Sequence, residues 1–373
     1  MDDLERELSG LLLDLGNGRT VACSRLPDRI GGTVVAVEEL RHNRGNEATF
    51  GIWRVRGLEG SAILKILRPP TGNWSDFWPT SEDPAHWNYW QREPLAYETG
   101  LVSSAYGECG LVPPELLTTN RRPDSMIELW LADVDGVEGF NWSASRIARF
   151  AYELGTGQAR WIGRVPETEW LSRRWLAQYM AEGPSRGVCV QDADWDHPLA
   201  AVWPNEVRQE LRRLWGERGY ALAATEAAER TLCHLDVWPA NLIDGQGRSV
   251  LLDWAFAGEG AVGEDVGSLI LHCFTDGLMP AALLPEVAET STDRYLEGLR
   301  DGGWSGSEDR VRSVVAASGV AKYSWFGPAV LSRAVNNDPG TSSYREDLSP
   351  ASAVQRTAEL VAFIAHWSRT VHG

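Results

Sequence analysis

The stretch "CHLDVWPANL" at residues 233–242, followed by "LLDWAF" at 251–256, decides how this sequence is interpreted. A histidine, an aspartate and an asparagine lie close together, and a further aspartate follows one turn later. The intervening "LIDGQGRSVLLD" predicts two strands joined by a Gly-rich reverse turn. Such a hairpin returns Asp253 to the side of Asn241, so we expect Asp236, Asn241 and Asp253 to face one cleft.

These three side chains suit one kind of chemistry. Transfer of a phosphoryl group requires an oriented hydroxyl and a metal that neutralises the developing charge. Carboxylate and amide oxygens are ligands that Mg²⁺ prefers. We therefore expect Asp236 to act as the catalytic base, and Asn241 and Asp253 to bind the metal. A lone aspartate is more often a helix cap or turn residue, but the complete set is more specific.

Composition limits the alternatives. The chain has 373 residues, 43% of them hydrophobic and 23% charged, which is typical of a globular protein. Its net charge of -17 argues against nucleic-acid partners and against an anionic membrane surface. The acidic N-terminus, the absence of a long apolar run and five scattered cysteines without a C-x-x-C pair indicate a cytoplasmic protein.

Lysine is almost missing from the chain. Of 35 basic residues only Lys65 and Lys322 are lysines, and the others are arginines. A retained lysine can mark a place where a compact ammonium is needed instead of a planar guanidinium. Both positions are therefore of interest, although either could be without a role.

The order of predicted elements divides the chain into two parts. Residues 31–67 alternate β-rich runs with a loop and predict an antiparallel meander. A helix over 88–101 and two strands, over 110–119 and 125–134, follow. Beyond Gly139 the pattern is helical, apart from short β signals around the 233–256 motif. It includes long helical stretches at 143–163 and 205–230 and a closing helix over 352–372.

A small sheet-rich part before a larger helical one, with an H-x-D-x-x-x-x-N loop in the latter, resembles the protein-kinase-like superfamily. More narrowly, it is similar to the aminoglycoside phosphotransferase (APH)-like family. The resemblance implies an α+β, bilobal protein-kinase-like fold, with a small antiparallel-sheet N-lobe and a larger helical C-lobe. We place a nucleotide-binding lobe at 1–131 and a lobe with the catalytic loop, metal site and acceptor pocket at 132–373.

The same resemblance gives roles to two further residues of the helical lobe. His234 would orient the catalytic loop by bonding backbone near the metal aspartate. Asp265, in "GEDVGSL", matches the aspartate that follows the metal loop in this family and braces the catalytic loop by hydrogen bonds.

In the small lobe, Lys65 of "AILKIL" stands where the strand lysine of kinases holds the α- and β-phosphates. Its implied partner is Glu93 in the R-E-x-x-x-Y helix, with Glu98 as the alternative. The segment 129–134 would be the hinge that binds the base through its backbone.

The remaining nucleotide contacts implied by the resemblance come from two loops. The loop "RHNRGNEATFG" would cover the phosphates, although it departs from G-x-G-x-x-G, and the hinge would border the base. The expected nucleotide-binding residues in these loops are Gly45, Asn46, Thr49, Leu131 and Asp133.

The implied activity is transfer of the γ-phosphate of ATP or GTP, with Mg²⁺, to a hydroxyl of a small molecule. Asp265 follows Asp253 by only twelve positions, which is too short for the activation segment of a protein kinase. An antibiotic or related glycosylated or nucleoside-like acceptor is the leading expectation, with a choline, sugar or amino-alcohol kinase as alternative. A pseudokinase is a third possibility. The Trp-rich segment 74–90 could stack on substrate or pack the core.

Overall fold

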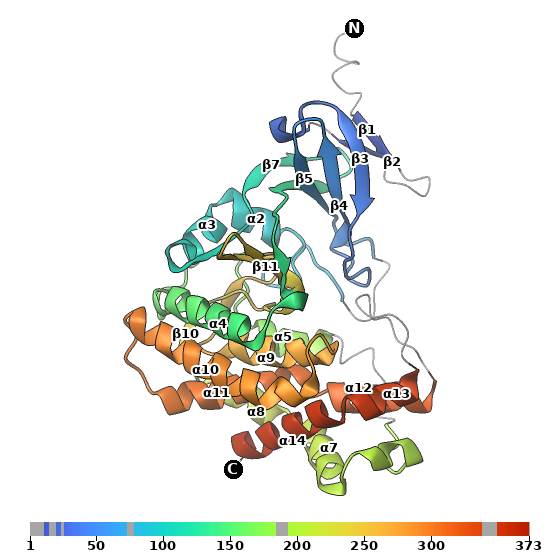
Figure 1. Ribbon diagram of the computed structural model, residues 1–373, viewed down its shortest axis with the longest axis vertical. Helices are drawn as coiled ribbons and strands as arrows, with labels where there is room; N and C mark the ends of the chain where they lie inside the picture. The colour runs from blue at the N-terminus through green and yellow to red at the C-terminus, as the bar shows by residue number, and fades with distance from the viewer. Residues whose placement is uncertain are drawn as a thin grey trace.

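A computed structural model describes residues 11–14, 20–23, 26–72, 78–183, 193–337 and 349–372. A β-sheet lies at one end of the molecule and a larger assembly of helices at the other (Figure 1). This arrangement confirms the predicted α+β, two-lobed fold. Trp74 and the N-terminal stretch 1–10 lie outside the described residues.

The N-terminal sheet has five strands in the order β3-β4-β5-β8-β7, and every neighbouring pair is antiparallel. The predicted meander is confirmed. The strands are β3 (Val34–Glu39), β4 (Thr49–Gly57), β5 (Ser61–Leu67), β7 (Leu116–Arg121) and β8 (Ile127–Ala132). A separate hairpin, β1 (Leu11–Asp14) with β2 (Thr20–Cys23), precedes them.

Strand periodicity explains how this sheet turns a lysine toward the helical region. Side chains alternate between the two faces of a strand. Along β5, Leu64 and Ile66 join Trp53 and Trp130 in a small core of their own. The residues of the other parity therefore face the helical region, where Leu67 joins the main hydrophobic core. Lys65 shares that parity.

A second, four-stranded sheet carries the decisive motif. Its order is β6-β12-β11-β9, with β6 (Leu111–Val112), β9 (Val137–Glu138), β11 (Leu242–Gly245) and β12 (Arg248–Leu251). Strand β10 (Arg230–Cys233) pairs with β13 (Gly258–Ala261). The prediction of one strand over 110–119 is wrong, because Pro113 and Pro114 interrupt it and proline cannot donate to a ladder. The first piece, β6, pairs parallel with β12 instead.

The helices lie after β5 and throughout the C-terminal region. Helix α2 covers only Arg92–Glu98, shorter than the predicted helix over 88–101. The predicted closing helix is divided at Thr357, and the 205–230 stretch at Arg218. The others are α3 (Leu101–Ala105), α4 (Ala144–Ala159), α5 (Trp175–Glu182), α7 (Asn205–Glu217), α8 (Gly219–Glu226), α9 (Glu264–Thr275), α10 (Leu284–Asp301), α11 (Glu308–Tyr323), α12 (Phe326–Val335), α13 (Pro350–Arg356) and α14 (Ala358–His372).

One apolar core joins these helices to the inner face of the five-stranded sheet. It includes Leu129 of β8, Phe150 of α4 and Ile270 of α9, all fully buried. The sheet and the helices are thereby fixed to each other by packing. Within the described ranges no helix is both long and apolar enough to span a membrane.

Candidate active site

Lys65 lies at the centre of a buried group of charges. Its Nζ is 2.6 Å from Glu93 Oε2 and 2.9 Å from Asp253 Oδ1. Glu98, the alternative partner, instead pairs with Arg121 near the surface. Burial alone would lower the pKa of Lys65, but Asp253 and Glu93 together raise it above its ordinary value. The ammonium therefore stays charged between two carboxylates.

Asp253 reaches this position through an unusual backbone conformation. Burial would raise the pKa of its carboxyl, but Lys65 holds that pKa below the ordinary value. Asp253 directly follows the β11–β12 hairpin and adopts φ 58°, in the left-handed region that non-glycine residues seldom occupy. Such strain is typical of functional sites.

Helix α2 is locked to its surroundings by Arg92, the residue before Glu93. The Arg92 guanidinium is fully buried and donates to backbone carbonyls of several segments. Burial lowers its pKa to about 9. Its five hydrogen bonds end on Pro84, His86, Trp87, Trp170 and Ala255. The R-E-x-x-x-Y pattern pointed to this helix, but no role for Arg92 was predicted from it.

The hairpin places Asn241 beside both aspartates. Leu252 N donates to Asn241 O at 2.9 Å, so Asp253 follows directly on a residue bonded to Asn241. The Asn241 Nδ2 donates to Asp236 O at 3.0 Å and to Asp236 Oδ2 at 3.2 Å. The structure thus brings Asp236, Asn241 and Asp253 into one group.

The group fits a hard divalent cation. Both hydrogen bonds of the Asn241 amide use its nitrogen, which leaves the amide oxygen as the ligand atom. Asp253 uses Oδ1 for Lys65, and its side chain is 36% exposed. No group of three or more His, Cys, Asp or Glu suited to a metal occurs among the described residues. Mg²⁺ commonly takes one or two protein oxygens and completes its shell with phosphates and water.

His234 connects two backbone segments of this site by hydrogen bonds. Its Nε2 lies 2.9 Å from the Leu252 carbonyl, and its Nδ1 accepts from Asp236 N at 3.3 Å. Burial lowers the pKa of His234 to about 4, so the ring is neutral. A neutral ring with the proton on Nε2 satisfies both bonds. His234 therefore links the Asp236 backbone to the residue before Asp253.

Asp265 accepts hydrogen bonds from the backbone of the same loop. The donors are His234 N at 2.9 Å and Leu235 N at 2.7 Å, with Gln158 Nε2 at 2.8 Å as a third. Leu235 has φ 67°, another left-handed non-glycine residue. The carboxylate thus lies where it can stabilise a strained turn immediately before Asp236.

Two of the residues expected in the phosphate-covering loop, Gly45 and Asn46, make hydrogen bonds within the protein. Gly45 N donates to Asn43 at 2.9 Å. The Asn46 side chain accepts from Ala48 N and from Asn88 Nδ2, both at 3.1 Å, and so ties the loop to the segment before α2. Thr49 begins β4.

The expected hinge residues lie at the end of β8. Leu131 is buried within that strand, where it pairs with Ile63 and Leu116. Asp133, just beyond it, accepts from Arg54 Nε at 2.9 Å and Ser61 Oγ at 2.8 Å. Its carboxylate is thereby held within the sheet region.

The described tryptophans of the 74–90 segment pack inward. Trp87 is fully buried and Trp90 nearly so. Trp78 stacks on Phe256, three residues after Asp253, at a centroid distance of 6.1 Å. Trp175 and Tyr179 of α5 stack on each other at 4.7 Å and extend the same cluster. These rings connect the segment before α2 with the helical region.

The second rare lysine, to which no role was assigned, also lies at this site. Lys322 of α11 is 5% exposed, and its Nζ is 3.9 Å from Asp236 Oδ1. Burial raises the pKa of Asp236 to about 6, and Lys322 opposes that shift. The scarcity of lysine was the one sequence signal that could have found this contact.

Comparisons with known proteins agree with this architecture. Residues 184–304 match the model of the phosphotransferase enzyme family, APH. The comparison with curated proteins gave no match. The fold is similar to that of amicoumacin kinase hAmiN in complex with AMP-PNP, Ca²⁺ and Ami, at 12% identity and a TM-score of 0.52. That similarity covers 90% of this chain and 87% of that one.

Two further solved structures are similar at lower TM-scores. One is aminoglycoside phosphotransferase APH(3'')-Id from Streptomyces rimosus, at 18% identity, a TM-score of 0.42, and 77% and 92% coverage of this chain and that one. The other is a choline/ethanolamine kinase family protein from Mesorhizobium loti, at 14% identity, a TM-score of 0.49, and 91% and 93% coverage. The family match covers residues 184–304, less than half of the chain, and the likeness to the amicoumacin kinase structure is one of fold.

Proposed function

We propose that this protein transfers the γ-phosphate of ATP or GTP to a hydroxyl of a small molecule in the cytoplasm. The observation that carries the proposal is the convergence of Lys65, Glu93 and Asp253 with Asn241 and Asp236 in one group. These are the residue types that phosphoryl transfer requires, and they come from both parts of the fold. We place the lobe boundary after residue 131.

In this proposal the reaction is an in-line displacement. The acceptor oxygen forms a bond to the γ-phosphorus while the bond from that phosphorus to the β–γ bridging oxygen breaks. Asp236 takes the hydroxyl proton, and the nucleoside diphosphate departs with the electron pair of the broken bond. Asp236 afterwards returns the proton to solvent.

The other residues would bind and orient the reactants. Lys65, held by Glu93, would contact the α- and β-phosphates, with the 41–51 loop above them and the backbone around Leu131 and Asp133 beside the base. Asn241 and Asp253 would hold Mg²⁺, which when bound neutralises charge on the phosphates. His234 and Asp265 would keep the catalytic loop in shape.

For the acceptor we propose an antibiotic or a related glycosylated or nucleoside-like compound, so that phosphorylation confers resistance. Support comes from the fold shared with an amicoumacin kinase.

The test is nucleoside-diphosphate release from ATP and from GTP with Mg²⁺, across antibiotics, nucleosides, sugars and amino alcohols. The Asp236→Asn protein is the control. Acceptor-dependent release that the control lacks is the expected result. Nucleotide binding without any acceptor-dependent release would contradict the proposal and favour a binding role. Growth of a sensitive host on the active compound then tests resistance.

A further inference from the structure

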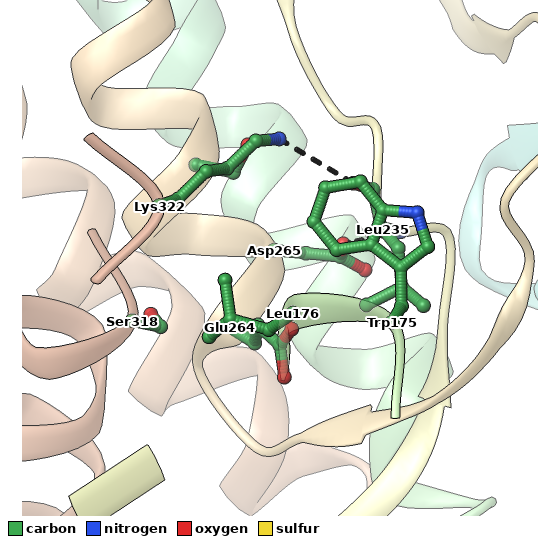
Figure 2. A pocket seen from close by; sticks show the side chains of 8 residues that line it. Trp175, Leu176, Leu235, Glu264, Asp265, Ser318 and Lys322 are labelled. Carbon is green, nitrogen blue, oxygen red and sulfur yellow. Dashed lines mark hydrogen bonds between the residues drawn. The ribbon is translucent and has the colours of Figure 1, made fainter. Parts of the chain in front are cut away.

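Lys322 is the charged group at this site that the proposed chemistry has not used. It projects from α11 into a small cavity lined also by Trp175, Leu235 and Asp265 (Figure 2). Three helices meet here, because Trp175 belongs to α5 and Asp265 to α9. The cavity lies directly behind the Asp236 loop.

The contacts of the Lys322 ammonium are few for a buried charge. Its Nζ donates to Ser268 Oγ at 2.7 Å and to the Leu235 carbonyl at 3.4 Å, the bond dashed in Figure 2. The Trp175 ring centroid is 4.8 Å away. The Asp236 carboxylate, at 3.9 Å, is the ion-pair partner. Ser268 and Leu235 are neutral, so Asp236 is the largest counter-charge, and Asp265 and Glu264 contribute less.

Stability alone gives little reason for a lysine in this place. A buried ion pair can often be replaced by apolar side chains of similar volume with no loss of stability. Methionine would fill the same space between α5, α9 and α11. Yet the chain, which uses arginine nearly everywhere, keeps a lysine here. Arginine would bring five donors in a rigid fork to a site with few acceptors.

The geometry around Asp236 shows what the ammonium does. Asp236 Oδ2 accepts from Asn241 Nδ2 at 3.2 Å, and Oδ1 faces Lys322. The carboxylate is thus held at both oxygens from the protein side, and its side chain remains 20% exposed. Lys322 also donates to the carbonyl of Leu235, the residue before Asp236. It therefore contacts both the side chain and the backbone of the loop.

We propose that Lys322 is a positioning residue for phosphoryl transfer, which holds the Asp236 carboxylate turned toward the acceptor hydroxyl. This inference rests on the proposed function. Asp253 and Asp236 then each have a lysine of their own, Lys65 from the sheet and Lys322 from a C-terminal helix. Both lysines of the chain serve one centre.

The first test compares Lys322→Met with Arg312→Met, which removes a half-exposed positive charge from the same helix. We expect Lys322→Met to lower kcat by about 10²-fold, the lower end of what a general base contributes, with the nucleotide KM unchanged. Arg312→Met should leave both unchanged. Lys322→Arg should not restore the rate.

The two kinds of failure are distinguishable. Transfer by the unaltered protein that continues at full rate in Lys322→Met would overturn this inference alone. Absence of transfer by the unaltered protein, with any acceptor, would overturn the proposed function and the positioning role with it.

A second measurement leaves Lys322 intact and so does not depend on the folding of a Lys322 variant. Because the chain has only two lysines, isotope-labelled lysine gives two side-chain NMR signals. Lys65→Arg assigns them by removing one. We expect Asp236→Asn to shift the Lys322 signal and to leave the Lys65 signal in place. An unmoved Lys322 signal would show that the ammonium does not sense Asp236, and would overturn the inference.

Discussion

The two lysines of this protein lie in unlike surroundings, and the difference is instructive. Lys65 is clamped between Glu93 and Asp253 at 2.6 and 2.9 Å. Lys322 lies 3.9 Å from Asp236, and its shorter contacts are hydrogen bonds to neutral groups. A tight pair fixes both of its members, whereas a looser one leaves the carboxylate able to exchange a proton. The Lys65 group is thus suited to holding charge, and the Asp236 group to reacting.

The largest expected effect comes from replacing Asp236 itself. Asp236→Asn should lower kcat for acceptor-dependent transfer by about 10²- to 10⁴-fold, because a positioned base contributes that much. Nucleotide affinity, measured by calorimetry, should be retained because the Lys65 group is intact. A rate near that of the unaltered protein would exclude Asp236 as the base.

Lys65→Arg breaks the other group. We expect kcat/KM for the nucleotide to fall by about 10- to 100-fold, since a hydrogen bond to a charged group contributes about 1.5–3 kcal/mol. A guanidinium fork cannot replace an ammonium held between two carboxylates in a buried site. Steady-state kinetics in ATP and in GTP measure the effect. Unchanged values would make Lys65 an ordinary strand residue.

Asp265→Asn tests whether the Asp265 carboxylate stabilises the loop that carries Asp236. The amide cannot accept at both positions, so the His234, Leu235 or Gln158 donor loses its partner. We expect the free energy of unfolding to fall by about 1–3 kcal/mol in denaturant titration. The matched control is Asp301→Asn, whose carboxylate accepts from Tyr152 at the surface and should matter little. An equal loss of unfolding free energy in both variants would show that Asp265 does not stabilise this loop.

The smallest expected effects test whether Glu93 or Glu98 is the partner of Lys65. Glu98→Gln should change stability by less than about 1 kcal/mol and leave nucleotide kinetics unaltered, because an exposed ion pair is weak. Glu93→Gln should raise the nucleotide KM, because it removes a charge that holds Lys65. The same KM for both variants would contradict the pairing.

The features that depend on local sequence pattern could be predicted. The hairpin within the 233–256 motif follows from turn chemistry, and the predicted fold class is confirmed. The break at Pro113 could have been predicted, because proline cannot donate to a strand ladder. The pairing of β6 with β12 depends on tertiary contacts that no local pattern encodes.

The contact of Lys322 with the loop that carries Asp236 could not be predicted from local sequence pattern either. Leu235 and Lys322 are 87 residues apart, and only the packing of α11 against α5 and α9 brings them together. Composition singled out the residue, but nothing near it in sequence named its partner. Likewise, the R-E-x-x-x-Y pattern marked Glu93 and not the carbonyls that surround Arg92.

Arg92 has a consequence for how the site moves. Its guanidinium joins the carbonyls of Trp170 and Ala255 to the turn that begins α2. Glu93 cannot swing away from Lys65 unless several of these bonds break together, and the Asp253 loop is drawn along through Ala255. We expect the charged centre to be assembled before any nucleotide arrives. An enzyme of the proposed kind would then be governed by the supply of its substrates and not by an internal on-off switch.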